Sequence, residues 1–271
     1  MTGEESRARL RALAAVTDDD FPLGEAALAL AALDRPQVPL DRYRDHLREL
    51  AASVDGGADA AARAAALAEA IAGRHRYQGD ALTYDDLQNA NLIRVMDRRK
   101  GLPVALGILY IETARRLGWQ ASGLAFPGHF LIAVGGAGGR AILDPFHGGR
   151  VCAAADLRRL LKSMAGDDEE LEPAHYAPVP NRSVLLRLHN NVKLRRMRAG
   201  DIPGALAALE AMLLFAPAEA ALWHEAALIH AHLGSLGSAL EAAARALEHT
   251  ADPAGRHRLA VLQQELRSRL N

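Results

Sequence analysis

Residues 127–131 read Pro-Gly-His-Phe-Leu and residues 142–146 read Ile-Leu-Asp-Pro-Phe. An apolar segment precedes both motifs, and its spacing predicts a helix that Pro103 starts and Gly118 ends. Three short apolar runs after it predict strands over 119–126, 130–134 and 140–143. A helix followed by a small antiparallel sheet is therefore expected in the middle of the chain.

Five residues, Gly-Gly-Ala-Gly-Gly at 135–139, connect the second and third of these strands. They predict a flexible hairpin connection that is longer than the tightest turns. Antiparallel pairing across it would bring His129, at the start of one strand, next to Asp144, at the end of the other. Pro127-Gly128 and Pro145 place both residues at strand ends, where functional sites collect.

A His and a carboxylate in this order can support a cysteine nucleophile, whose thiolate a helix N-terminus stabilises. The first turn of the helix reads Pro103-Val104-Ala105-Leu106-Gly107-Ile108 and contains no Cys, Ser or Thr. His129 and Asp144 are thus either a catalytic pair that lacks its nucleophile or a hydrogen-bonded pair that braces two strands.

The single cysteine offers an alternative nucleophile. Cys152 lies eight residues beyond Asp144, just before a helix expected over 156–163. Lone cysteines are more often small core side chains, and that interpretation is favoured here. His129, Asp144 and His147 are also ligand types that suit zinc, but they follow no further spacing rule, so no metal site is expected.

The C-terminal part of the chain contains an internal repeat. Residues 34 positions apart match, as in Gly200 with Gly234 and Ala205 with Ala239. This period, with small residues where paired helices cross, is typical of tetratricopeptide repeats. Two units and a terminal helix (253–270) are fewer than a free-standing array needs.

The motifs together resemble the SirB-type family of bacteria, and the resemblance runs from about Pro36 to Leu270. It implies a papain-like or transglutaminase-like core with a tetratricopeptide tail, in which His129 and Asp144 match a retained pair. The motifs also supply the candidate binding residues Asn89, Tyr110, Phe146 and His147. The chain departs from the family where serines are usual, and it has Ala90, Ala105 and Gly107 there.

The expected fold class is α+β, in three sections. Residues 1–75 form an alanine-rich helical layer, 76–180 the transglutaminase-like core with a small antiparallel sheet, and 181–271 an all-α tetratricopeptide region. An acidic, proline-containing linker near 167–180 joins the last two sections.

Composition limits the partners. The net charge is −1, which gives no basic field for nucleic acid or an anionic membrane. One cysteine indicates a reducing compartment, and the acidic residues 1–6 lack the apolar run of a signal peptide, so a cytoplasmic protein is expected. No segment predicts a membrane span, and no cofactor is expected.

Two functions follow from these patterns. The favoured one is a non-catalytic protein that binds a protein or peptide through its core and its tetratricopeptide tail. The alternative is an amide-bond hydrolase or acyltransferase that uses His129 and Asp144 with water, or with Cys152. The nucleophile distinguishes the two, because only the enzyme needs one.

Overall fold

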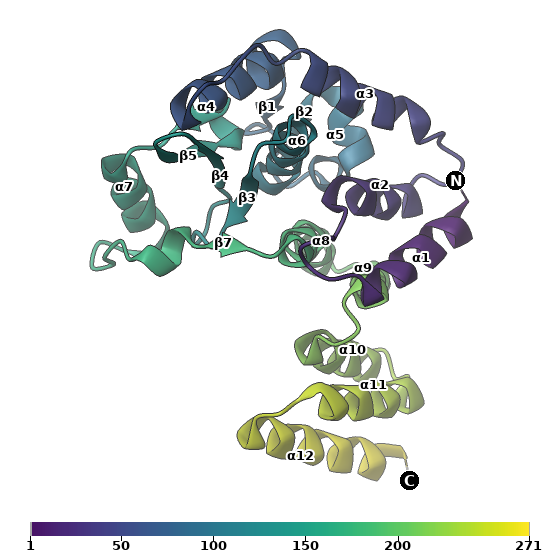
Figure 1. Cartoon of the computed structure of the whole chain (residues 1–271). Helices are drawn as coiled ribbons and strands as arrows, with labels where there is room; N and C mark the ends of the chain where they lie inside the picture. Colours follow the sequence, from purple (N-terminus) through teal and green to yellow (C-terminus); the bar gives the residue numbers. More distant parts are fainter. Residues whose placement is uncertain (1, 271) are drawn as a thin grey trace. The chain divides into compact units, whose positions relative to one another are not determined.

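The computed structural model describes residues 2–270 (Figure 1). The chain forms two compact units. The first contains residues 1–6 and 17–188, and the second contains residues 7–16 and 189–271. Helix α8 begins in the first unit and continues into the second. None of the helices among the described residues is long and apolar enough to cross a membrane.

Helices form the N-terminal part of the chain. They are α1 (Gly3–Ala12), the 3-10 turn η1 (Leu13–Ala15), α2 (Leu23–Leu33), α3 (Asp41–Ala52), α4 (Ala60–Ala68) and the π-helical turn η2 (Glu69–Arg74). Asp59 caps α4 by accepting a hydrogen bond from the Ala62 N–H.

Helices α2, α3 and α4 and the turn η2 belong to the same unit as the core, whereas residues 7–16, which form most of α1 and the turn η1, belong to the second unit. Two side chains far apart in sequence make the connection. Glu112 accepts a hydrogen bond from the Gly24 N–H at 2.9 Å, and the Asn91 amide donates to the Ala31 carbonyl at 3.0 Å. These two hydrogen bonds fix α2 against the centre of the unit.

The central helix is α6 (Pro103–Arg116), and Pro103 occupies its first turn as predicted. Before it come β1 (Gln78–Gly79), η3 (Leu87–Ala90), α5 (Leu92–Arg98) and β2 (Lys100–Gly101). Arg99, in the left-handed conformation with φ of 58°, ends α5. Gly101 lies in β2, which pairs in parallel with β1.

Five antiparallel strands make the main sheet, in the order β6-β5-β4-β3-β7. The strands are β3 (Ala121–Leu124), β4 (Ile132–Gly136), β5 (Gly139–Asp144), β6 (Arg150–Val151) and β7 (Pro178–Val179). The expected linker near 167–180 thus also carries the 3-10 turn η5 (Pro173–Tyr176) and an edge strand. A proline is tolerated at β7 because an edge strand need not donate on both sides.

The hairpin between β4 and β5 is tighter than expected from the sequence. Gly136 pairs with Gly139, so only two residues form the turn. Gly138 and Gly139 have φ of 82° and 117°, values that glycine adopts without steric cost. The prediction of a longer connection is wrong, because three of the five residues in the glycine run extend the strands.

The two faces of the sheet have different neighbours. Helix α6 packs on the face that carries Phe130 and Ile132, and a Cβ added at Gly107 would lie 2.4 Å from a ring carbon of Phe130. The opposite face forms a buried cluster that includes Leu131, Ala133 and Leu161 of helix α7 (Ala154–Ala165). Alternation along β4 thus sends successive side chains into two separate layers.

The second unit consists mainly of helices: the end of α8 (Asn181–Arg198), α9 (Ile202–Phe215), α10 (Ala220–His232), α11 (Leu236–His249) and α12 (Pro253–Leu270). Two of its turns are equivalent. Gly200 and Gly234 have φ of 74° and 77°. The Asp201 N–H donates to the Arg196 carbonyl, and the Ser235 N–H donates to the His230 carbonyl, both at 2.9 Å. The 34-residue repeat in the sequence therefore corresponds to two turns with the same backbone conformation.

Candidate functional site

The hairpin brings His129 and Asp144 together, as the antiparallel pairing predicts. His129 follows Gly128, whose φ is 68°, and precedes β4, while Asp144 ends β5. The distance from His129 Nε2 to Asp144 Oδ1 is 2.9 Å. Both residues are buried, with 8% and 1% of their surface exposed.

Asp144 accepts four hydrogen bonds. Oδ1 accepts from His129 Nε2 and from the N–H groups of Phe146 and His147, and Oδ2 accepts from His147 Nδ1 at 2.7 Å. Burial alone would raise the pKa of Asp144, but the hydrogen bonds from His129 and His147 outweigh it and hold the pKa below its usual range. Asp144 is therefore ionised at neutral pH with its lone pairs occupied.

This network fixes the hydrogen on the His129 ring. A carboxylate only accepts, so Nε2 carries the hydrogen and Nδ1 keeps a lone pair in the neutral ring. Within residues 2–270, the His129 ring makes its hydrogen bond to Asp144 alone. An imidazole oriented in this way is a competent proton acceptor.

The ring of His129 has an aromatic neighbour, Phe146. Phe146 meets the His129 ring edge to face, with centroids 6.4 Å apart, and the ring of Tyr84 meets Phe146 at 5.8 Å. The candidate binding residues Phe146 and His147 thus lie at the site, and His147 remains exposed over 58% of its side chain.

The structure places the other two candidate binding residues differently. Asn89 is fully buried, where its amide donates to the Thr83 carbonyl and its oxygen accepts from Arg98. It braces the loop before α5. Tyr110 of α6 is also buried, its hydroxyl has no hydrogen-bond partner among the described residues, and burial raises its pKa. A Cβ at Gly149 would lie 2.6 Å from that hydroxyl.

No nucleophile occupies the start of α6. Pro103, Val104 and Ala105 are buried. At Gly107, one of the positions where the resemblance leads one to expect a hydroxyl, an added Cβ would lie 2.4 Å from a Phe130 ring carbon, so a side chain there would force the ring to move. The close packing of α6 on the sheet therefore depends on a residue without a side chain at position 107.

Cys152 is a core residue in this structure. It lies in the apolar cluster beneath α7, and its thiol faces the Arg150 carbonyl at 3.7 Å. Burial, followed by the charge of Asp144, raises the pKa of the Cys152 thiol to about 11. A thiol in this state is protonated at neutral pH and is a weak nucleophile.

Arg187 of α8 is a positioning residue that the sequence did not reveal. Its guanidinium donates to the His129 carbonyl at 2.7 Å and to the Phe126 carbonyl at 3.3 Å. It also stacks over the Phe130 ring, 5.4 Å from the centroid. Arg187 therefore holds both ends of the turn that presents His129. It lies 58 residues away in a helical segment, so no local motif marks it.

His129, Asp144 and His147 form a group whose ligand atoms lie within 4.8 Å of one another. Both histidine nitrogens that face Asp144 donate to it, and the carboxylate is saturated by four hydrogen bonds. A metal ion here would have to displace this network. The three side chains are arranged as a hydrogen-bonded network around Asp144 rather than as ligands of a metal ion.

Comparison with known proteins identifies the fold. The family model described as transglutaminase-like superfamily matches residues 40–190.

The chain belongs to the transglutaminase-like superfamily.

Its curated relatives include bacterial proteins. It is 32% identical over 188 residues to a UPF0162 protein of Xylella fastidiosa, a match that spans 66% of each chain. It is 30% identical over 208 residues to a UPF0162 protein of Vibrio cholerae, covering 74% of this chain and 77% of that protein. A shorter match, 33% over 57 residues, links it to mouse F-box only protein 21 and covers 21% of this chain and 9% of that protein.

The comparison with solved structures found no significant match. The family model covers the central helix, the sheet and both members of the His129–Asp144 pair. The expected fold class, α+β with a transglutaminase-like domain followed by helices, is therefore confirmed.

Proposed function

We propose that this chain is a non-catalytic, SirB-type member of the transglutaminase-like superfamily that binds a peptide through a tetratricopeptide-like C-terminal region. One observation carries the proposal. The His129–Asp144 pair is intact, but buried hydrocarbon occupies the helix start where a nucleophile would lie. A cytoplasmic setting fits the single buried thiol.

A groove in the second unit supports peptide binding. Helices α9, α10 and α11 line a cavity of about 500 Å³. Trp223 lines this cavity. Its indole N–H donates a hydrogen bond to the Pro217 carbonyl at 2.7 Å, which fixes the orientation of the ring. Leu213 and Leu214 supply an apolar wall. A rigid aromatic side chain beside aliphatic ones is the usual anchor for a bound peptide.

The charges of the groove indicate the kind of peptide. Glu210 and Glu241 lie on its walls, both exposed, and neither has an ion-pair partner among the described residues. Arg245, which also lines the groove, is paired with Glu248 at 3.1 Å. The uncompensated charge is therefore negative. The occupant we propose is a segment with one large apolar side chain flanked by lysine or arginine.

A peptide-display selection on the full chain tests the proposal, followed by fluorescence anisotropy with the selected peptides. The selected peptides should combine an apolar anchor with a basic residue. Trp223→Ala should weaken their binding by about tenfold or more, as expected for a central aromatic residue. Glu241→Gln should weaken it less and reduce its dependence on salt.

The matched control is His129→Ala, which alters the first unit and should leave peptide affinity unchanged. Peptides that bind the Trp223→Ala protein as tightly as the wild type would contradict the proposed groove. So would a selection that yields only acidic sequences.

One observation favours a second candidate, the hydrolysis of an amide or acyl bond by water. His129 Nδ1 has a lone pair, and the ring is oriented by an ionised carboxylate, as a general base requires. This reaction needs no thiol. Turnover of an acyl substrate that is lost in His129→Ala but retained in Cys152→Ala would establish it and reject the non-catalytic proposal.

A further inference from the structure

A second cluster of possible metal ligands lies in the first unit, on elements that the pair His129–Asp144 does not use. His46 and Glu49 are three residues apart on α3, which places them on one face of the helix. His75 follows the π-helical turn η2. The ligand atoms of the three side chains lie within 4.8 Å of one another.

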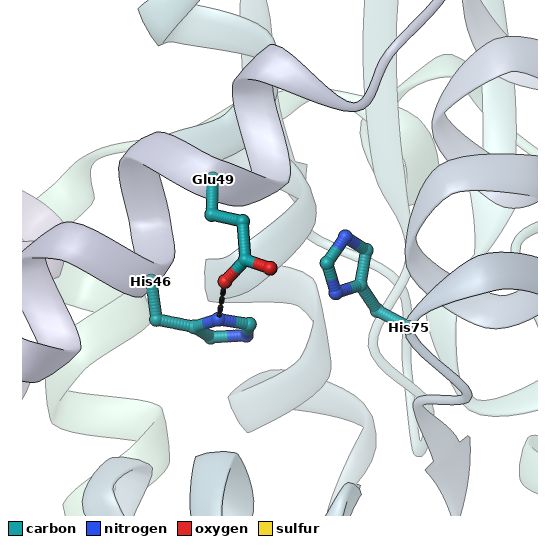
Figure 2. Close-up of side chains that lie close together, drawn as sticks. All are labelled: His46, Glu49 and His75. Atoms are coloured by element: carbon teal, nitrogen blue, oxygen red, sulfur yellow. Dashed lines mark hydrogen bonds and ion pairs between the residues drawn. The ribbon is translucent and has the colours of Figure 1, made fainter.

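The three side chains converge on one point. His46 Nδ1 lies 2.7 Å from a Glu49 carboxylate oxygen, and the rings of His46 and His75 meet edge to face with centroids 5.5 Å apart. Figure 2 shows the Glu49 carboxylate between the two rings, with a ring nitrogen of His75 turned toward it. The η2 turn ends with the His75 N–H bonded to the Ala70 carbonyl, five residues earlier. Such π-type turns are frequent at functional sites.

Each histidine has an outer partner. Ser53 donates its hydroxyl to the Leu50 carbonyl, so His75 Nε2, 3.2 Å away, donates to the Ser53 oxygen. That bond leaves the Nδ1 lone pair of His75 available. Outer hydrogen bonds of this kind orient metal-binding histidines.

The outer partner of His46 is Tyr77. His46 Nε2 lies 3.0 Å from the Tyr77 hydroxyl, and Arg99 donates both to that hydroxyl and to Nε2. Arg99 therefore approaches His46 from the side opposite Nδ1, away from Glu49. The positive charge of Arg99 therefore lies at the Nε2 side of the His46 ring, and the Glu49 carboxylate lies at the Nδ1 side.

Glu49 is free to change partners, in contrast to Asp144. It accepts one hydrogen bond and is 64% exposed, whereas Asp144 accepts four and is 1% exposed. Burial lowers the pKa values of His46 and His75, and the bond to His46 lowers the pKa of Glu49. Neutral imidazoles beside an ionised carboxylate are what a transition-metal ion requires.

We propose that His46, Glu49 and His75 bind a divalent first-row transition-metal ion of the zinc type. His46 Nδ1, a Glu49 oxygen and His75 Nδ1 serve as ligands, and a water molecule fills the fourth position. The hydrogen on His46 then moves from Nδ1 to Nε2, where the Tyr77 hydroxyl accepts it, and the hydrogen bond that Arg99 donates to Nε2 is given up. The ion ties α3 to the segment after η2.

Zinc titration by calorimetry tests the site, with the metal-stripped full chain carrying no histidine tag. The wild type should bind one equivalent of zinc. His75→Ala and Glu49→Gln each remove a ligand and should weaken binding by more than about tenfold. Tyr77→Phe removes only the outer hydroxyl and should weaken it by about 10–100-fold. Circular dichroism establishes that each variant is folded.

The matched control is His147→Ala, which removes a member of the other three-residue group. Its zinc affinity should equal that of the wild type. Cobalt substitution gives a second measurement, because a four-coordinate site shows intense visible absorption bands that should disappear in His75→Ala.

Three results would overturn the proposal. One is the absence of zinc binding by the wild type up to about 100 μM. Another is unchanged zinc affinity in His75→Ala and Glu49→Gln. The third is loss of binding in His147→Ala with retention in His75→Ala, which would move the metal to the group around Asp144.

Discussion

Asp144 shows how one buried carboxylate organises a site. It orients His129, holds His147 and caps the turn that carries Phe146. The same bonds that make His129 a suitable base also make the pair a brace between β4 and β5. The free energy of unfolding of single-residue variants can show whether the pair holds β4 and β5 together.

His129→Ala should lower the free energy of unfolding by about 1–3 kcal/mol, because it strands one hydrogen-bonding position of a buried carboxylate. His147→Ala should cost less, since that side chain is 58% exposed. Chemical denaturation of the three proteins measures both. An unchanged unfolding midpoint for His129→Ala would show that the pair does not brace the strands.

At the level of elements, the close contact of α6 with the sheet shapes the site. Gly107 lets the helix approach Phe130, and a side chain at residue 107 would overlap the Phe130 ring. The absence of a hydroxyl there follows from packing.

Gly107→Ala tests this contact. The added methyl group would overlap the Phe130 ring, so the variant should lose about 1–3 kcal/mol of stability through overpacking. Gly237→Ala in α11 is the matched control, because nothing lies within 4 Å of its added Cβ. It should gain about 0.4–1 kcal/mol. Equal effects from the two substitutions would show that α6 does not pack as described.

The sequence predicts those elements whose signals are local. Pro103 marks the start of α6, the apolar run at 130–134 predicts β4, and antiparallel pairing across the glycine run predicts the meeting of His129 with Asp144. Features that depend on distant partners are not predictable in this way. Arg187 acts on a turn 58 residues away, and β7 is a strand only because β3 offers an edge. The cluster of His46 and His75 likewise needs the fold to bring its members together.

At the level of the whole molecule, the two units differ in their chemistry. The first carries the His129–Asp144 pair and the His46–Glu49–His75 cluster, and the second is helical with a buried histidine of its own, His189. Burial, followed by the charge of Arg196, lowers the pKa of His189 from 6.5 to about 4. The second unit should therefore respond to acid.

Protonation favours the unfolded chain, in which His189 has its ordinary pKa. The contribution of neutral His189 to the free energy of unfolding is complete above pH 6.5. About 3 kcal/mol of it is lost as the pH falls toward about 4. His189→Leu removes this titration, so its stability should fall less than that of the wild type over this range. Urea denaturation at a series of pH values measures the difference. Parallel pH profiles for the two proteins would contradict the assignment.

The most direct test of a non-catalytic core is intact-mass spectrometry after incubation with an activated acyl ester. The wild type and His129→Ala should show the same pattern of adducts, with none that depends on His129, because the Cys152 thiol is protonated and the first turn of α6 offers no nucleophile. A single acyl adduct on the wild type that disappears in His129→Ala would contradict this account and identify the protein as an acyl-transferring enzyme.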